Sequence, residues 1–251
     1  REGHATLIRP FPISVAFENT DGNNTGNEQA KSAARDIIQK DLGVRLEFLG
    51  VGVDRIDYTK GIPERFMAIG RLFEKYPEFI GRFTFVELGA PSRTHIKRYH
   101  DLISELDVLS DNINWRYKTK AWKPIVFLKA HHGHQAIMSH YKGADVCIVS
   151  SLHDGMNLVA KEFVAARNDN DGVLILSQFA GAARELSDAI IINPYDIEAM
   201  TDAIYQALTM NHADRSERMR RMRAVVRENN IYRWAGNFIT DLARLRLEEN
   251  G

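Results

Sequence analysis

Two patterns of apolar and polar residues follow each other in turn along the chain. Short apolar runs rich in β-branched residues predict buried strands, and the amphipathic segments between them predict helices. The expected strands are Leu46–Val51, Phe83–Leu88, Ile125–Leu128, Val146–Val149, Val173–Leu176 and Ile190–Ile192. The expected helices are Glu28–Leu42, Pro63–Lys75, Thr94–Leu109, Gln135–Lys142, Met156–Ala166, Asp196–Leu208, Asp214–Glu228 and Ile231–Leu247. This alternation predicts an α/β fold: a doubly wound, Rossmann-like parallel sheet covered by helices, with extra helices after the last strand.

The beginning of the chain does not follow this pattern. Pro10, Pro12 and the polar run Asn19–Asn27 predict a loop or linker. The chain also begins at Arg1, without a Met and without a charged-then-apolar leader. We therefore expect residues 1–27 to be a linker and loop from an N-terminal half that this piece lacks, and residues 28–251 to form one domain that includes the C-terminal helices.

Composition restricts the partners and the compartment. The chain has 251 residues, of which 44% are hydrophobic, and this is enough for a substantial core. Its 33 basic and 33 acidic side chains give a formal net charge of +0, so no global field attracts nucleic acid or an anionic membrane. There is no apolar run of about 18 residues, which predicts no membrane span. The single cysteine, Cys147, excludes a disulfide framework and fits a reducing cytoplasm.

The loops after the strands are the first places to look for chemistry, because a ligand of an open α/β sheet binds outside the carboxyl ends of the strands. The loop after Leu46–Val51 carries Arg55 and Lys60, shortly before a predicted helix. Together these two cations could clamp a diphosphate. Alternatively, they are surface cations that pair with Asp54 and Asp57. The third glycine of a dinucleotide-binding fingerprint is missing here, which disfavours an NAD site.

The loop after Val146–Val149 is the second candidate. Gly155 lets the backbone pass close to a ligand, and the helix expected from Met156 aims unpaired N–H groups at an anion. Asp154 could accept hydrogen bonds from sugar hydroxyls, and Glu162, two turns along the helix, could accept from a ribose. The alternative is that Asp154 is an N-cap and Glu162 a solvated helix residue.

Two weaker signals follow other strands. Arg93, at the end of the loop after Phe83–Leu88, could hold a second phosphate, although an arginine in this position is often only solvated. The small residues of 177–183 form a turn that would let backbone approach a ligand.

Four longer motifs follow one another along the chain: Val53–Gly61, Asp154–Glu162, Gly172–Ala182 and Asn193–Asp196. Through them the chain resembles the C-terminal half of the trehalose-6-phosphate synthases. These are retaining glycosyltransferases of the GT-B architecture, which has two Rossmann-like domains. The resemblance covers nearly the whole chain from Pro10 onward.

The resemblance implies a site for UDP-glucose in residues 28–251. It implies three catalytic side chains, of which two hold the diphosphate and the third holds glucose hydroxyls: Arg55, Lys60 and Asp154. It implies that a stretch of backbone cradles sugar and phosphate: Gly155, Met156, Asn157, Leu158 and Val159. Glu162 would take the ribose, and Arg93 would lie near the phosphate of the acceptor, glucose 6-phosphate.

The implied reaction transfers glucose with retention from UDP-glucose to glucose 6-phosphate, giving trehalose 6-phosphate and UDP. It implies no cofactor, no metal and no side-chain nucleophile. In this family the N-terminal domain of the same polypeptide supplies most acceptor contacts, so we expect the isolated chain to bind the donor and to be inactive alone. We expect no nucleic-acid or membrane partner, and a homo-oligomer stays open.

Other functions remain open at this stage. The family usually carries Pro, Arg and Gly where this chain has Ser151, His153 and Ser14. These departures leave the acceptor undecided, and a related sugar-phosphate synthase of the glucosylglycerol-phosphate type is an alternative. A catalytically silent regulatory module is another, although the retention of all four donor side chains favours an enzyme. The preference for UDP over ADP or GDP has no side-chain signature.

Three further features have simpler interpretations. We interpret His131, His132 and His134 as residues that line a loop, because no carboxylate stands near them at ligand spacing. The six arginines of residues 215–227 predict a solvated helix face in a neutral protein. An apolar stripe at helical spacing is predicted to be partly exposed, or covered by a neighbouring chain: Trp234, Phe238, Leu242 and Leu245.

Overall fold

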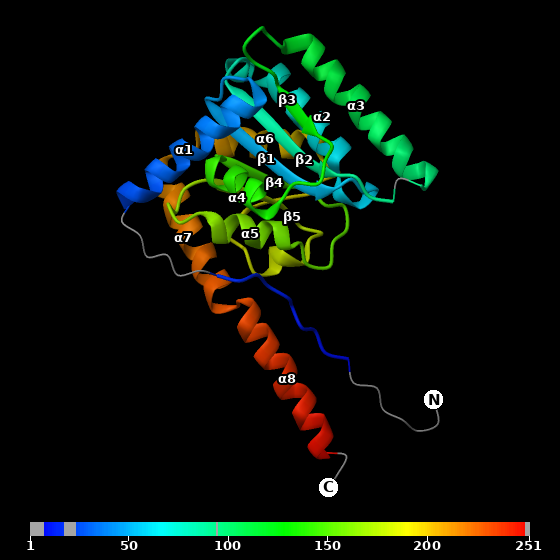
Figure 1. Ribbon diagram of the computed structural model, residues 1–251, viewed down its shortest axis with the longest axis vertical. Coiled ribbons are helices and arrows are strands. Elements are labelled where there is room, and N and C mark those ends of the chain that lie inside the picture. The colour runs from blue at the N-terminus through cyan, green and yellow to red at the C-terminus, as the bar shows by residue number, and fades with distance from the viewer. Residues whose placement is uncertain (1–7, 18–23, 94, 249–251) are drawn as a thin grey trace.

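Within the described part of the chain, six strands form one parallel sheet in the order β3-β2-β1-β4-β5-β6 (Figure 1). The structure is a computed structural model, and it describes residues 8–17, 24–93 and 95–248. The strands are β1 (Phe48–Arg55), β2 (Phe83–Ala90), β3 (Ile125–Leu128), β4 (Val146–Val149), β5 (Val173–Ser177) and β6 (Ile190–Ile192). This is the strand order of a Rossmann sheet, so the predicted doubly wound fold is confirmed.

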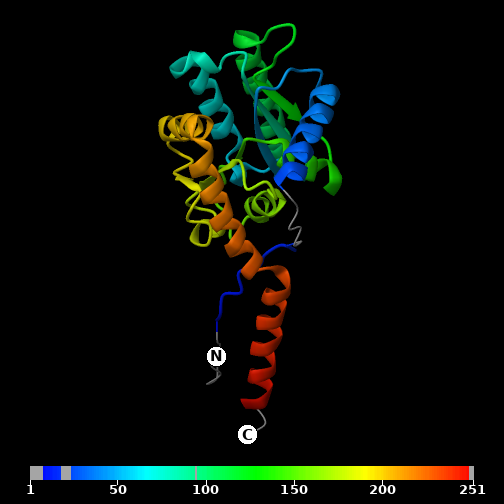
Figure 2. The ribbon, with the colours of Figure 1, turned by 90° about the vertical axis from the view of Figure 1, so that its left-hand side faces the viewer.

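Helices cover both faces of the sheet (Figures 1 and 2). They are α1 (Asn24–Leu42), α2 (Ile62–Lys75), α3 (Lys97–Tyr117), α4 (His134–Gly143), α5 (Leu158–Ala166), α6 (Ile197–Thr209), α7 (His212–Glu228) and α8 (Ile231–Glu248). The short 3₁₀ helices are η1 (Tyr58–Lys60), η2 (Pro77–Phe79) and η3 (Gly181–Arg184). Neighbouring residues of β4 point into different cores: Ile148 packs with α2 and α6 residues, and Cys147 with those of α4 and α5.

β1 is longer than its hydrophobic pattern predicts. Its pairing with β2 continues from Phe48↔Phe83 to Arg55↔Ala90, because the neighbouring strand supplies partners beyond the apolar run. Arg55 is therefore the last residue of a strand and does not lie in a loop.

Two helix boundaries lie at least four residues from their predicted positions. α3 ends at Tyr117 and not at Leu109, because Leu106, Ser110 and Asn114 continue its buried face at intervals of four residues. α1 begins at Asn24, so the expected boundary between residues 27 and 28 falls inside a helix.

The described part of the expected linker, residues 8–17, is tied to the domain. The backbone oxygen of Phe11 accepts a hydrogen bond from Trp234 Nε1 (3.0 Å), and that of Val15 accepts one from the N–H of Ile231 (3.0 Å). The Nζ atom of Lys161, which is 1% exposed, donates to the backbone oxygen of Ile13 (3.0 Å). This segment is thus fixed between α5 and the α7–α8 junction.

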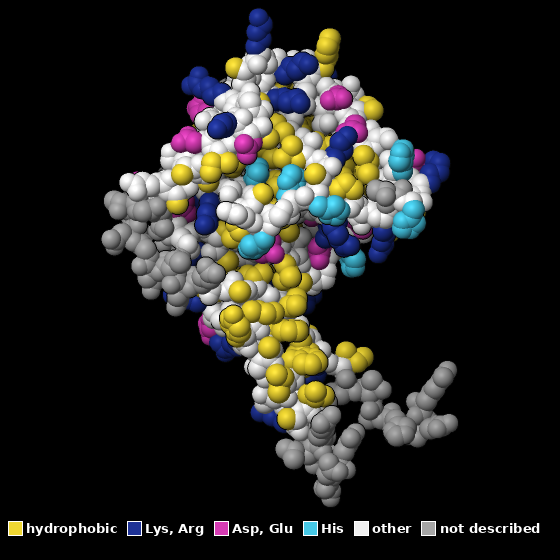
Figure 3. Space-filling view, in the orientation of Figure 1, with side chains coloured by type: hydrophobic (Ala, Val, Ile, Leu, Met, Phe, Trp, Pro, Cys, Tyr) yellow, Lys and Arg dark blue, Asp and Glu magenta, His cyan; other side chains and the backbone are white. Residues whose placement is uncertain are grey.

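α8 projects away from the sheet, and the N-terminal segment runs in the same direction (Figures 1 and 2). Apolar side chains are visible along this projection (Figure 3). Phe238 is 44% exposed and Leu242 is 48% exposed, so the prediction of a partly exposed stripe is confirmed for these two residues. The side chain of Leu245 lies outside the described residues. None of the described helices has the length and apolar character that a membrane span needs.

The expected solvated face of α7 is wrong for three of its arginines. Arg223 donates to the backbone oxygens of Val164 and Ala165 near the end of α5 (3.2 and 2.9 Å), and Arg218 donates to a backbone oxygen at Asp188 (3.0 Å). Arg215 pairs with Asp171. These contacts hold α7 against the rest of the domain. The sequence pattern alone could not show whether these arginines are solvated or bound to other elements.

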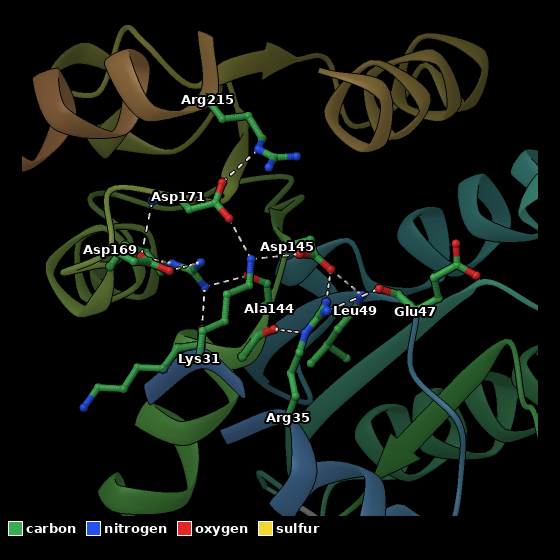
Figure 4. Close-up of polar contacts among 12 residues, drawn as sticks. Lys31, Arg35, Glu47, Leu49, Ala144, Asp145, Asp169, Asp171 and Arg215 are labelled. Carbon is green, nitrogen blue, oxygen red and sulfur yellow. Dashed lines mark hydrogen bonds and ion pairs between the residues drawn. The ribbon is translucent and has the colours of Figure 1, made fainter. Parts of the chain in front are cut away.

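An ion-pair network holds α1 and α7 at the amino ends of the central strands, opposite the candidate site (Figure 4). Asp145, just before β4, accepts from Arg35 and from the N–H of Leu49 (2.9 Å). Asp171, just before β5, pairs with Lys31 (2.7 Å) and with Arg215 (2.8 Å). Burial alone would raise the pKa of Asp171, but Lys31 and Arg215 outweigh it and hold the pKa well below its usual range.

We expect Asp171→Asn to lower the free energy of unfolding at neutral pH by roughly 1.5–3 kcal/mol, because it removes a charged partner from a partly buried network. A depressed carboxyl pKa contributes stability above its unfolded value of 3.8, and this is lost as the pH falls through the folded pKa. Urea unfolding between pH 2 and 7 measures both effects. Asp101→Asn, in an exposed pair with Lys97, is the control and should cost less than about 1 kcal/mol. Equal losses in the two variants would contradict the prediction.

Candidate donor-binding site

The candidate site lies at the carboxyl ends of β1 and β4, where the strand order reverses. These two strands are neighbours, and their connections leave in opposite directions along the sheet, which opens a crevice for a ligand at this edge. The loops that follow them contact each other directly. The N–H of Leu152 donates to the backbone oxygen of Thr59 (2.8 Å), and Ser150 Oγ donates to that of Gly61 (2.8 Å).

Lys60 and Asp154 join the two predicted loops. Their Nζ and Oδ2 atoms are 2.6 Å apart, and the side chains are 15% and 16% exposed. Burial alone would raise the pKa of Asp154, but the bonds from Lys60, the N–H of Met156 and Asn157 outweigh it, and the pKa is lowered. The site therefore holds an ionised carboxylate and an ammonium side by side.

The helix after this loop begins later than expected. α5 starts at Leu158, and its N-cap is Asn157, whose Oδ1 accepts from the N–H of Ala160 (3.1 Å). Asn157 has a φ of 73°, a conformation that asparagine tolerates better than most residues. The N-cap alternative for Asp154 is therefore wrong, and its carboxylate is directed at Lys60.

Arg55 lies at the end of β1 and is exposed. Within the residues that the structure describes, its side chain makes no hydrogen bond or ion pair, and it acts on Asp57 only as a nearby charge that helps to lower the pKa of that carboxyl. The alternative pairing of Arg55 and Lys60 with Asp54 and Asp57 is wrong: Asp54 pairs with Arg65, and Asp57 caps η1 by accepting from the N–H of Thr59 (3.0 Å). Arg55 is thus available to an anion in front of the strand.

Arg93 is connected to the first loop through a tyrosine. Its Nη1 lies 2.9 Å from the hydroxyl of Tyr99, and that hydroxyl donates to Asp57 Oδ2 (3.3 Å). The φ of Arg93 is 48°, which lies in the left-handed region. Arg93 is exposed, but it is oriented by Tyr99 and is not a freely solvated side chain.

The small-residue turn of residues 177–183 supports the second loop. The N–H of Gly181 donates to the backbone oxygen of Asp154 (3.0 Å), and the N–H of Ala182 donates to that of Met156 (2.7 Å). A Cβ atom on Gly181 would lie 2.1 Å from the backbone oxygen of Gly155. This turn therefore supports the candidate donor loop, residues 150–157 after β4. The close approach seen here is to protein backbone, and approach to a ligand stays a prediction.

Glu162 lines a cavity of about 430 Å³ beside α4 and α5, together with Met138 and Val15. The hydroxyl of Tyr141 donates to its Oε2 (3.2 Å). Burial raises the pKa of Glu162 above its usual value. It is therefore a half-buried, oriented acceptor, and the solvated alternative is wrong.

A buried cation lies beneath the site and was not predicted from the sequence. Arg65 of α2 is 0% exposed, and it pairs through Nη2 with Asp54 (2.8 Å) and through Nη1 with Glu87 (2.6 Å). Its Nε donates to Ser150 Oγ (2.9 Å). One signal was present: Glu87 stands within the apolar strand Phe83–Leu88, and a charge in that position requires a buried partner.

The departures from the family pattern lie in different environments. Ser151 is buried beside Asn157, whose Nδ2 is 3.4 Å from its Oγ, whereas His153 is exposed. Ser14 is buried, and its hydroxyl has no hydrogen-bond partner among the described residues. No group of three or more His, Cys, Asp or Glu side chains suited to a metal ion occurs in the described ranges.

The sheet order and the site at its switch point define a Rossmann-like domain of the GT-B type. The family model for "Glycosyltransferase family 20" matches residues 1–244, and the chain belongs to this family. A trehalose-6-phosphate synthase of Escherichia coli O1:K1 / APEC is 41% identical over 248 residues, which are 97% of this chain and 50% of that protein.

Two solved structures extend the similarity. A trehalose-6-phosphate enzyme from E. coli bound with UDP-2-fluoro glucose has a TM-score of 0.80 and 36% identity, over 92% of this chain and 51% of that one. An α,α-trehalose-phosphate synthase (UDP-forming) from Burkholderia xenovorans in complex with glucose-6-phosphate has a TM-score of 0.82 and 36% identity, over 92% and 51%. This chain thus spans about half the length of these relatives.

Proposed function

We propose that this chain is the nucleotide-sugar-binding half of a retaining glucosyltransferase. The reaction transfers glucose from UDP-glucose to glucose 6-phosphate and gives trehalose 6-phosphate and UDP. The observation that carries the proposal is the contact of Lys60 with Asp154 at the switch point of the sheet. A cation of a kind that binds phosphate, next to a carboxylate of a kind that accepts from sugar hydroxyls, supports a site at the junction of a sugar and a diphosphate.

The proposed chemistry follows from where charge develops. The bond between the glucose carbon and the diphosphate oxygen breaks, and negative charge collects on the departing UDP. Arg55, Lys60 and the N-terminus of α5 stabilise that charge more in the transition state than in the ground state. The acceptor hydroxyl attacks from the same face and gives its proton to the leaving phosphate. No side-chain nucleophile, cofactor or metal is part of this proposal.

The remaining contacts are assigned by position. Asp154 binds glucose hydroxyls, and the backbone from Gly155 to Val159 cradles sugar and phosphate. Glu162, half-buried and held by Tyr141, accepts from the ribose. Arg93, oriented by Tyr99, binds the phosphate of glucose 6-phosphate.

The partner that completes the site is, in this proposal, an N-terminal half of the same polypeptide. The half-length match to the relatives supports it, and so does the apolar surface of α8 around Phe238 and Leu242. We also propose a cytoplasmic location, where both sugar-phosphate substrates would be available.

Calorimetric titration of the chain with UDP, ADP and GDP tests the proposal. We expect UDP to bind at least about tenfold more tightly than ADP or GDP. If UDP does not bind, the titration is repeated with the N-terminal half of a family relative added. Absence of UDP binding in both experiments would contradict the proposal.

A further inference from the structure

Arg65 contacts the backbone of the turn that carries Lys60, both directly and through Ser150. Its Nη2 atom is 3.5 Å from the backbone oxygen of Lys60. The Ser150 hydroxyl, which accepts from Arg65 Nε, lies 2.8 Å from the backbone oxygen of Gly61 and 3.3 Å from that of Lys60. One guanidinium is therefore connected to two consecutive carbonyl groups of the turn.

The surrounding atoms leave this arrangement little freedom. A Cβ atom on Gly52 would lie 2.2 Å from both Arg65 Nη1 and Glu87 Oε2. Gly61 has a φ of 64°, and a Cβ atom there would lie 2.1 Å from the backbone oxygen of Ser150. Glycine at these two positions lets the cation and the turn pack against the ends of β1 and β4.

Arginine is suited to this position because its planar fork makes three directed bonds at once. Asp54 on β1, Glu87 on β2 and Ser150 after β4 each take one nitrogen. A lysine in the same place has one nitrogen and cannot span the three strands. The hydrogen bonds of Arg65 thus hold the turn that contains Lys60 in a fixed position relative to the ends of β1, β2 and β4.

We propose that Arg65 is a positioning residue for Lys60: it fixes the turn from which Lys60 reaches Asp154 and the donor phosphate. The part that concerns the donor phosphate rests on the proposed function. The part that concerns the contact of Lys60 with Asp154 does not, because that contact exists in the protein alone.

Carboxyl NMR titration of Asp154 tests the proposal without any nucleotide. Lys60→Ala should raise the pKa of Asp154 because it removes the strongest partner of the carboxylate. Arg65→Lys should produce about half or more of that rise, because a displaced Lys60 pairs less well. Arg71→Lys, on the exposed side of the same helix, is the matched control and should leave the pKa unchanged. An unchanged Asp154 pKa in folded Arg65→Lys would overturn the proposal.

A second variant covers the case in which Arg65→Lys does not fold, which thermal unfolding reveals. Ser150→Ala removes only the link through the hydroxyl, so it should raise the pKa of Asp154 in the same direction by a smaller amount. If the pKa of Asp154 does not change in Ser150→Ala, the positioning role of Arg65 is rejected.

Binding of UDP and of uridine separates positioning from general distortion. Arg65→Lys should weaken UDP about tenfold and change uridine by less than about twofold, because Lys60 acts on phosphate and not on the nucleoside. Equal losses for UDP and uridine would overturn the proposal. If the wild-type chain binds no UDP, either alone or with the N-terminal half of a relative added, the proposed function is contradicted, and the titration of Asp154 still decides the role of Arg65.

Discussion

Replacing Lys60 with alanine is expected to lower the affinity for UDP about a hundredfold. Loss of a hydrogen bond to a charged group costs up to about 3 kcal/mol, which corresponds to about a hundredfold in affinity. Here the loss has a second component, because the Lys60 Nζ atom lies 2.6 Å from Asp154 Oδ2. Without Lys60, the carboxylate stays half-buried beside the diphosphate and repels it. Calorimetry with UDP measures the effect, and transfer assays in a full-length relative should show a similar loss of rate.

The control for this prediction is Lys97→Ala, because the Lys97 side chain is 86% exposed and pairs with the exposed Asp101. It should bind UDP as the wild type does. The double variant Lys60→Ala with Asp154→Ala should recover part of the lost UDP affinity, because the unpaired carboxylate is gone. Wild-type affinity in Lys60→Ala would remove the cation from the proposed donor site.

Gly181→Ala is expected to damage the site without changing any residue that the proposal assigns to donor binding. The new Cβ atom would lie 2.1 Å from the backbone oxygen of Gly155 and 2.8 Å from its carbonyl carbon. Both are backbone atoms, so the donor loop itself must move. We expect a loss of about 1–3 kcal/mol in the free energy of unfolding, the usual cost of overpacking. UDP affinity should also fall, because the moved backbone no longer fits the ligand.

Two other glycines provide the comparison. A Cβ atom on Gly236 of α8 would meet no atom within 4 Å, so Gly236→Ala should preserve both stability and UDP affinity. Gly155 is equally open, so Gly155→Ala should preserve stability and lower only the affinity for UDP-glucose. If Gly181→Ala resembles Gly236→Ala in urea unfolding and in calorimetry, the support of the donor loop by this turn is disproved.

Much of the fold could be predicted because its signals are local. The apolar runs of β3, β4 and β6 were predicted with the same bounds that the structure has, since each is a short continuous apolar run. β4 is buried at every position, whereas the edge strands β3 and β6 are partly exposed. Errors arose where a neighbouring element decided the boundary. Pairing with β2 extends β1 to Arg55, and the fit of Asn114 against Ile125 extends α3.

The sequence by itself determined the α/β class, the loops that carry the candidate donor residues, and the family motifs. Only the tertiary structure decided which charges pair. Lys60 and Asp154 are 94 positions apart in the sequence, and Arg65 pairs with Glu87, which is 22 positions away. Sequence spacing therefore could not decide whether Lys60 pairs with a nearby carboxylate or with one that is distant in the sequence. The strand order determines the partner, because it brings the ends of β1 and β4 together. It also buries Arg65 in a position where a charge is stable only when it is paired.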